Sequence, residues 1–124
     1  MNKQYGNFIN GENEFKITER DIPRNWYNYL WNDRYITFVS QTGTGNGFVQ
    51  DNISNRINNL SGRVMYLVEN GAHWGITGLS ADERLDGYSC THGLGYTDIE
   101  TENFGIKSQV RFLSRMMMTV KYGR

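Results

Sequence analysis

The sequence predicts an all-β domain, folded as an antiparallel β-sandwich. Short runs rich in Tyr, Phe, Ile, Val and Thr alternate with frequent Gly and Asn, which is typical of strands separated by turns. Asn10-Gly11 and Asn70-Gly71 supply the positive φ angles that tight hairpin turns require. Helical periodicity is nearly absent. Residues 53–60 carry one apolar face, but this stretch is short and Asn-rich, so we expect one turn of helix there at most.

The first half of the chain predicts one hairpin and one further strand. Tyr5–Ile9 and Glu14–Ile17 flank the Asn10-Gly11 turn and are expected to pair with each other. Tyr35–Ser40 follows a second turn signal at Asn32-Asp33 and is rich in β-branched and aromatic residues, which favour strands.

The second half predicts the remaining strands. Arg63–Glu69 has the strongest strand pattern, ends at Asn70-Gly71 and is expected to pair with His73–Ile76. Tyr96–Glu102 has polar residues at every second position (Asp98, Glu100 and Glu102 among them), which indicates that one face of this strand is in water. Two more strands complete the expected set, Tyr88–His92 and Ile106–Phe112.

Composition limits the classes of function. The length of 124 residues suits one domain, and 13 basic residues balance 13 acidic ones, so no positive field is available to bind nucleic acid. No apolar run approaches the roughly 20 residues of a membrane helix, and the N-terminus lacks the apolar core of a signal peptide. We therefore expect a soluble, cytoplasmic protein. With one Cys and two His, we predict no disulfide framework, metal or cofactor.

The glycine-rich segment Thr42–Phe48 is the first candidate for a ligand site. Its G-x-G-x-G spacing, without a following Lys or a strong helix, argues against a phosphate-binding loop. We interpret it as a connection between strands. The alternative is a ligand-facing loop, in which Asn46, Gln50 and Asp51 hydrogen-bond hydroxyl groups.

The nucleophilic and acidic residues predict no complete catalytic set. Cys90 and His92 share a strand face, but we interpret them as a buried thiol and a structural histidine rather than a catalytic pair. The carboxylates on Tyr96–Glu102 alternate on one strand face as solvated charges do, whereas glycoside chemistry needs two carboxylates that face each other. We predict no catalytic residue in this chain.

Aromatic residues are numerous for so short a chain. Flat rings can stack on sugar faces, although a Trp in a small β domain is more often part of the core. The side chains in question are Trp26, Tyr27, Tyr29, Trp31 and Trp74.

An ordered series of motifs resembles the N-terminal end of the cellobiose phosphorylase family, glycoside hydrolase family 94 (formerly glycosyltransferase family 36). The Trp-x-Asn-Tyr-Leu element at Trp26–Leu30 and the His-Gly-x-Gly-Tyr-Thr element at His92–Thr97 are its most specific parts. The resemblance extends from Tyr5 to Phe112. The complete series is Tyr5–Phe8, Glu14–Thr18, Pro23–Leu30, Ser40–Asp51, Arg63–Val68 and Tyr88–Thr97.

The resemblance implies a galactose mutarotase-like supersandwich, here incomplete, over residues 1–112. Family members continue into an α/α toroid, whose Asp acts as general acid while phosphate attacks the anomeric carbon of a β-glucoside with inversion. This chain lacks the toroid, so the resemblance implies no catalytic residue here. In the family the sandwich helps to form a dimer, and its loops approach the sugar site of the neighbouring subunit. The expected substrate-contact residues are Asn46, Phe48, Gln50, Asp51, Trp74 and His92.

Residues 113–124 depart from the family pattern. Met116, Met117 and Met118 correspond to ATG-ATG-ATG, and a shift of one base gives consecutive Asp codons, which suit the acidic residues that the family has there. We hypothesise that a frameshift has produced a divergent tail. The alternative is a natural short tail in which Met residues fill gaps in the core.

Two hypotheses of function follow. In the first, the chain is the truncated N-terminal carbohydrate-binding-type domain of a disaccharide or oligosaccharide phosphorylase, inactive alone. In the second, it is a self-standing sugar-binding or protein-interaction module. An incomplete sandwich exposes strand edges. We expect these edges to be covered by a second copy in a homodimer or by a missing catalytic domain, and to cause aggregation otherwise.

Overall fold

The protein consists of β-strands joined by turns. The computed structural model describes residues 3–49, 56–58, 63–79 and 84–114, with 56–58 described for the backbone alone, and none of these residues is helical. This confirms the all-β prediction, and every strand pair is antiparallel. The strands are β1 (Gly6–Ile9), β2 (Glu14–Ile17), β3 (Asn28–Trp31), β4 (Tyr35–Val39), β5 (Gly47–Val49), β6 (Arg56–Asn58), β7 (Tyr66–Glu69), β8 (Ala72–Gly75), β9 (Gly87–Gly93), β10 (Tyr96–Asn103) and β11 (Ile106–Leu113).

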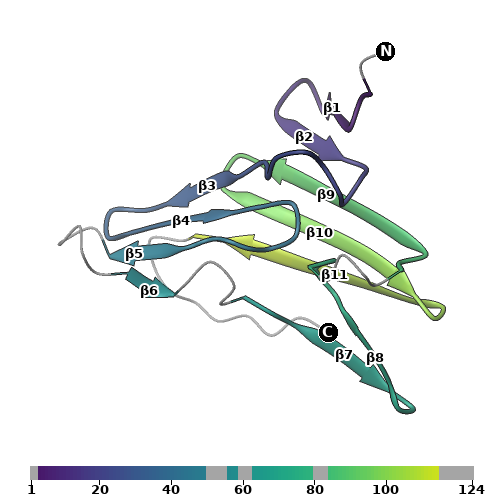
Figure 1. The fold of residues 1–124 in the computed structure, drawn as a ribbon. Coiled ribbons are helices and arrows are strands. Elements are labelled where there is room, and N and C mark those ends of the chain that lie inside the picture. The colour runs from purple at the N-terminus through teal and green to yellow at the C-terminus, as the bar shows by residue number, and fades with distance from the viewer. Residues whose placement is uncertain (1–2, 50–55, 59–62, 80–83, 115–124) are drawn as a thin grey trace.

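A five-stranded sheet in the order β1-β2-β9-β10-β11 carries the main core (Figure 1). Ile17 is opposite Cys90, and Cys90 is opposite Ile99, so the three side chains form a row across β2, β9 and β10. All three are completely buried. Phe15 and Phe112 pack against this row at half-buried positions. Alternate residues of these strands therefore form the inner face of the sandwich.

The opposite face of the same sheet is polar. Asp98 and Glu100 alternate along β10 with Thr97, Ile99 and Thr101, which are buried. The carboxylate of Asp98 accepts two hydrogen bonds of 2.7 Å from the guanidinium of Arg111 on β11. This arrangement confirms the prediction that one face of Tyr96–Glu102 is in water.

A four-stranded sheet, β3-β4-β5-β6, forms the second layer. The sequence interpretation missed β3 and β5, because β3 contains Asn28 and β5 lies in the glycine-rich segment. Residues 53–60, for which we expect at most one turn of helix, contain no helix in their described part, since Arg56–Asn58 forms β6 and pairs with β5. Pairing with a neighbouring strand overrides the weak helical pattern there.

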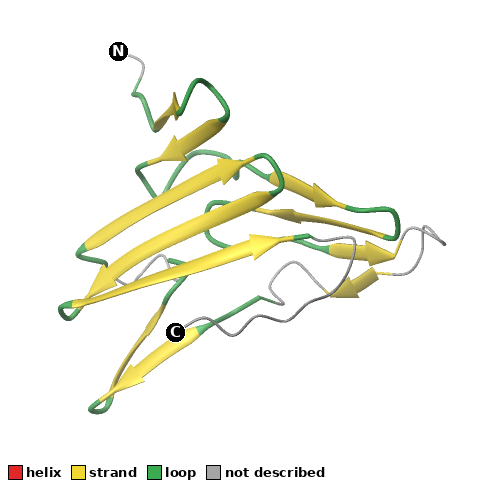
Figure 2. Ribbon diagram, turned by 180° about the vertical axis from the view of Figure 1, so that it is seen from behind, coloured by secondary structure: helices red, strands yellow, loops and turns green. Residues whose placement is uncertain are grey.

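The hairpin of β7 and β8 projects from the two larger sheets (Figures 1 and 2). Asn70 and Gly71 both have positive φ at its turn, as the sequence predicts, although the strand begins at Tyr66 rather than at Arg63. The predicted domain boundary at residue 112 falls just before the end of β11. Residues 115–124 lie outside the described part, so the division at 112/113 stays a prediction.

Candidate functional site

The two most specific motifs, Trp26–Leu30 and His92–Thr97, meet at the side chain of Asn28. Its amide nitrogen lies 2.8 Å from the carbonyl oxygens of Gly93 and Tyr96 and 3.1 Å from Oγ1 of Thr97, and it donates hydrogen bonds to them. These acceptors lie at the ends of β9 and β10 that flank their turn, more than 60 residues away along the chain. Asn28 therefore fixes β3 to that turn.

His92 makes the second connection between the same motifs. Its Nε2 donates to the carbonyl oxygen of Trp26 at 2.8 Å, so its Nδ1 is the acceptor for the hydroxyl of Thr97 at 2.9 Å. Both ring nitrogens therefore have hydrogen-bond partners, one as donor and one as acceptor, which suits a neutral imidazole. Burial lowers the pKa of His92 below its ordinary value, which also favours the neutral form.

Gln41 joins the glycine-rich segment to the same cluster. Its side chain is 3% exposed and accepts a hydrogen bond of 3.2 Å from the backbone N–H of Trp26. Its amide nitrogen donates to Oδ1 of Asn25 at 3.0 Å and to the carbonyl of Arg20 at 3.3 Å. The hydroxyl of Tyr88 donates a hydrogen bond to the backbone carbonyl of Gln41. Three motifs that are distant in sequence therefore form one hydrogen-bonded cluster.

The glycine-rich segment turns its own N–H groups inward. The backbone nitrogens of Thr42 and Thr44 donate to Oγ of Ser40 at 3.2 and 3.1 Å, and that of Gly43 donates to the Ser40 carbonyl at 3.1 Å. A phosphate-binding loop needs such groups aimed at the ligand. The geometry instead matches the interpretation as a connection between β4 and β5.

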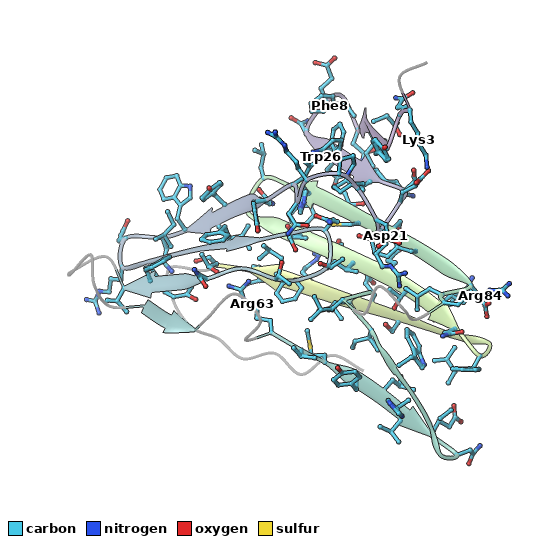
Figure 3. All side chains as sticks on the ribbon, in the orientation of Figure 1. Lys3, Phe8, Asp21, Trp26, Arg63 and Arg84 are labelled. Carbon is cyan, nitrogen blue, oxygen red and sulfur yellow. The ribbon has the colours of Figure 1, made fainter. Side chains whose placement is uncertain are left out.

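Arg63 holds the connection between β4 and β5 in place. Its guanidinium donates to the carbonyls of Phe38 and Asn46 at 3.0 and 3.3 Å and to the hydroxyl of Thr37 (Figure 3). The same group lies 5.8 Å from the centre of the Phe112 ring on β11. Arg63 therefore links the four-stranded sheet to the five-stranded one.

The predicted contact residues of the glycine-rich segment have different surroundings. Asn46 is only 9% exposed, and its Oδ1 has no hydrogen-bond partner among the described residues. Phe48 is half-buried in β5. Gln50 and Asp51 lie outside the described residues. A role of these four residues in sugar contact stays a prediction.

The Trp residues divide into buried and exposed ones. Trp74 on β8 is 1% exposed, and its Nε1 has no partner in the described part of the chain. By contrast, Tyr29 and Trp31 on β3 are 59% and 68% exposed. Trp26 and Tyr27, just before β3, are 37% and 38% exposed, so the two rings of β3 are the most exposed of this group.

Cys90 has the environment of a structural residue. It is completely buried, and its Sγ lies 4.0 Å from the ring nitrogens of His92, which already have other partners. Burial raises the pKa of the Cys90 thiol to about 12. Because the thiolate is the reactive form, this thiol is not an activated nucleophile.

The histidine environment predicts a pH dependence of stability. Since the folded-state pKa of His92 lies below its ordinary value of 6.5, the unfolded chain binds the proton more readily. The contribution is fully present above pH 6.5 and is lost as the pH falls toward the folded pKa. Urea unfolding at about pH 7.5 and pH 5.5 measures the resulting loss of stability.

His92→Gln should reduce this loss of stability between the two pH values. His73→Gln provides the matched control, because His73 is exposed on β8 and should leave the difference unchanged. An identical pH dependence in the native chain and in His92→Gln would contradict the assignment.

Two packed antiparallel sheets with long-range motif contacts define the chain as a β-sandwich domain. The profile of the family described as "Glycosyl hydrolase 94, supersandwich domain" matches residues 13–124. The chain belongs to this family, and the match agrees with the supersandwich expected from the motif series.

Phosphorylases are among the curated relatives. The chain is 34% identical to a solabiose phosphorylase and 36% identical to a 3-O-beta-D-glucopyranosyl-beta-D-glucuronide phosphorylase, both of Paenibacillus borealis. It is 29% identical to an N,N'-diacetylchitobiose phosphorylase of Vibrio proteolyticus. Each alignment covers 86% of this chain but only 14–16% of the relative. The chain thus spans about a sixth of the length of these enzymes.

Sequence reasoning did not single out Asn28 and Gln41 as organising residues. Both lie inside the motifs that carry the family resemblance, but nothing in their spacing shows which atoms they contact. No strand pattern in the sequence marks either position, since β3 is not predicted and Gln41 lies beyond the end of β4.

The described part of the chain holds no helix with the length and apolar character that crossing a bilayer requires. It also holds no group of three or more His, Cys, Asp or Glu side chains placed to bind a metal ion.

Proposed function

We propose that this chain is the supersandwich domain of a disaccharide or oligosaccharide phosphorylase and has no activity alone. The observation that carries the proposal is the family match over residues 13–124. The phosphorylase relatives support it, since the chain corresponds to about a sixth of their length. The whole enzyme would cleave a β-glucoside with inorganic phosphate in the cytoplasm.

The contacts around the motif cluster support a scaffolding role for this domain. Cys90 and His92 have no free reactive atom, since the thiol is buried and both imidazole nitrogens are hydrogen-bonded. Gln41 and Arg63 fix the glycine-rich connection from two sides. We infer that the domain presents this connection, with Gln50 and Asp51, to a sugar site completed by a catalytic domain or by a second subunit.

An activity assay and DNA sequencing test the proposal together. The isolated chain should release no phosphate from glucose 1-phosphate with glucose as acceptor. Sequencing of the genomic DNA from the Arg111 codon onward should reveal, in a shifted frame, the remainder of a phosphorylase. Phosphate release by the chain alone would contradict its inactivity. A locus without such a continuation would contradict the fragment proposal and favour the self-standing module.

A further inference from the structure

An exposed groove lies between β3 and the turn that joins β9 to β10. Its walls are the rings of Tyr29 and Trp31 on one side and Leu94 on the other, with Asn28, Gly93 and Gly95 between them. The groove encloses about 320 Å³. Tyr29, Trp31 and Leu94 are 59%, 68% and 82% exposed, so their apolar surface is open to solvent. Open apolar surface of this kind commonly marks a binding site.

The groove is held rigid by the motif cluster. Asn28 lies at its base and fixes the turn through hydrogen bonds to Gly93, Tyr96 and Thr97. Both walls are therefore set before any ligand arrives. A site formed in advance loses less conformational entropy on binding than a flexible one.

The base of the groove admits close approach to the backbone. A Cβ added to Gly95 would have no atom within 4 Å, so the space above this residue is open. Gly95 also has a φ of +84°, a backbone conformation that residues other than glycine rarely adopt. A ligand can thus approach the backbone at Gly95 while it rests on the rings.

The chemistry of the lining selects a neutral ligand. Every residue that lines the groove is uncharged. Tyr29 and Trp31 are separated by one residue on a strand, so their rings lie on the same face about 7 Å apart along it. The C–H groups on one face of a pyranose ring form an apolar surface that aromatic rings can cover, while its hydroxyls can reach peptide groups.

We propose that Tyr29, Trp31 and the Gly93–Gly95 turn form a binding groove for a neutral oligosaccharide. The proposal rests on the proposed function for the choice of a carbohydrate as ligand. It is distinct from the predicted contact residues that the structure describes, since Asn46, Phe48, Trp74 and His92 do not line the groove. The groove would hold a sugar chain without acting on it.

A protein surface is the competing occupant. Tyr27 and Phe38 extend the aromatic surface of the outer sheet, with ring centres 5.1 Å apart. An extended aromatic surface of this kind suits protein contact, whereas the part beside Leu94 is concave and leaves the backbone of Gly95 open. The concave shape and the backbone access therefore favour the sugar.

Titration of the 124-residue chain with cellotetraose and with N,N'-diacetylchitobiose tests the groove. Calorimetry should show saturable binding of at least one sugar, and tryptophan fluorescence should change in parallel. Trp31→Ala and Tyr29→Ala should each weaken binding about tenfold or more, because each removes a stacking ring. Tyr66→Ala is the matched control, since Tyr66 is also 59% exposed but lies on β7. This variant should bind like the native chain.

Three results would contradict the proposal that this groove binds a sugar. They are the absence of saturable binding by either sugar, binding that survives both groove substitutions, and equal loss of binding in Tyr66→Ala. If sugar binding is absent and self-association is lost in Trp31→Ala, the surface belongs to a protein contact. Circular dichroism of each variant separates lost binding from lost folding. None of these results changes the outcome of the sequencing and phosphate-release tests, so the two proposals fail separately.

Discussion

Replacement of Gly45 by alanine is expected to lower the free energy of unfolding by about 4 kcal/mol or more, or to prevent folding. A Cβ at this position would lie 1.8 Å from the carbonyl oxygen of Phe38 and 2.8 Å from its carbonyl carbon. These are backbone atoms of β4, which pairs with β3 and β5 and cannot move aside. Gly45 also has φ of +149°, a conformation that side chains disfavour. Urea unfolding measures the effect.

Gly105→Ala separates crowding from backbone strain. Gly105 also has positive φ, +74°, but a Cβ there would meet no atom within 4 Å. Its substitution should therefore cost only about 1–2 kcal/mol, the usual penalty for a left-handed residue. If both variants lose the same stability, the close approach of Gly45 to Phe38 is not what requires glycine.

Asn28→Ala is expected to cost about 2–4 kcal/mol, because it removes the donor that serves several partly buried acceptors at once. The carbonyls of Gly93 and Tyr96 would lose this partner, and β3 would lose its attachment to the turn. The loss should appear in the urea unfolding midpoint. A weaker protection of the Tyr96 region against hydrogen exchange should accompany it.

Asn7→Ala is the control for the loss of an asparagine side chain. Asn7 is exposed on β1, and its amide donates only to the carbonyl of the adjacent Phe8 at 3.2 Å among the contacts described. Its substitution should change stability by about 0.5 kcal/mol or less. A similarly small effect in Asn28→Ala would show that Asn28 does not hold the two motifs together.

Local patterns predicted the hairpins and the alternating strand correctly. Asn10-Gly11 and Asn70-Gly71 each form the predicted turn, because positive φ is a property of the turn residues themselves. Tyr96–Glu102 alternates as predicted, because a strand places successive side chains on opposite faces. These features depend on neighbours in sequence, so the sequence is sufficient to predict them.

Strands defined mainly by pairing were missed. β5 is three residues long and contains Gly47, and its strand character comes from its partners β4 and β6. The strand at Arg56–Asn58 was missed for the same reason, within a segment where at most one turn of helix is expected. Weak local preference gives way when a neighbouring strand offers hydrogen bonds to the backbone.

By itself, the sequence determined the all-β class, the principal hairpins and the family, because turn chemistry, alternation and motif order are written along the chain. Only the tertiary structure decided that Asn28, Gln41 and His92 bring three distant motifs into one hydrogen-bonded cluster. It also decided that Trp74 is buried while Trp31 is exposed. Both depend on which segments pack across the two sheets, and side-chain burial is set by those long-range contacts rather than by residue type.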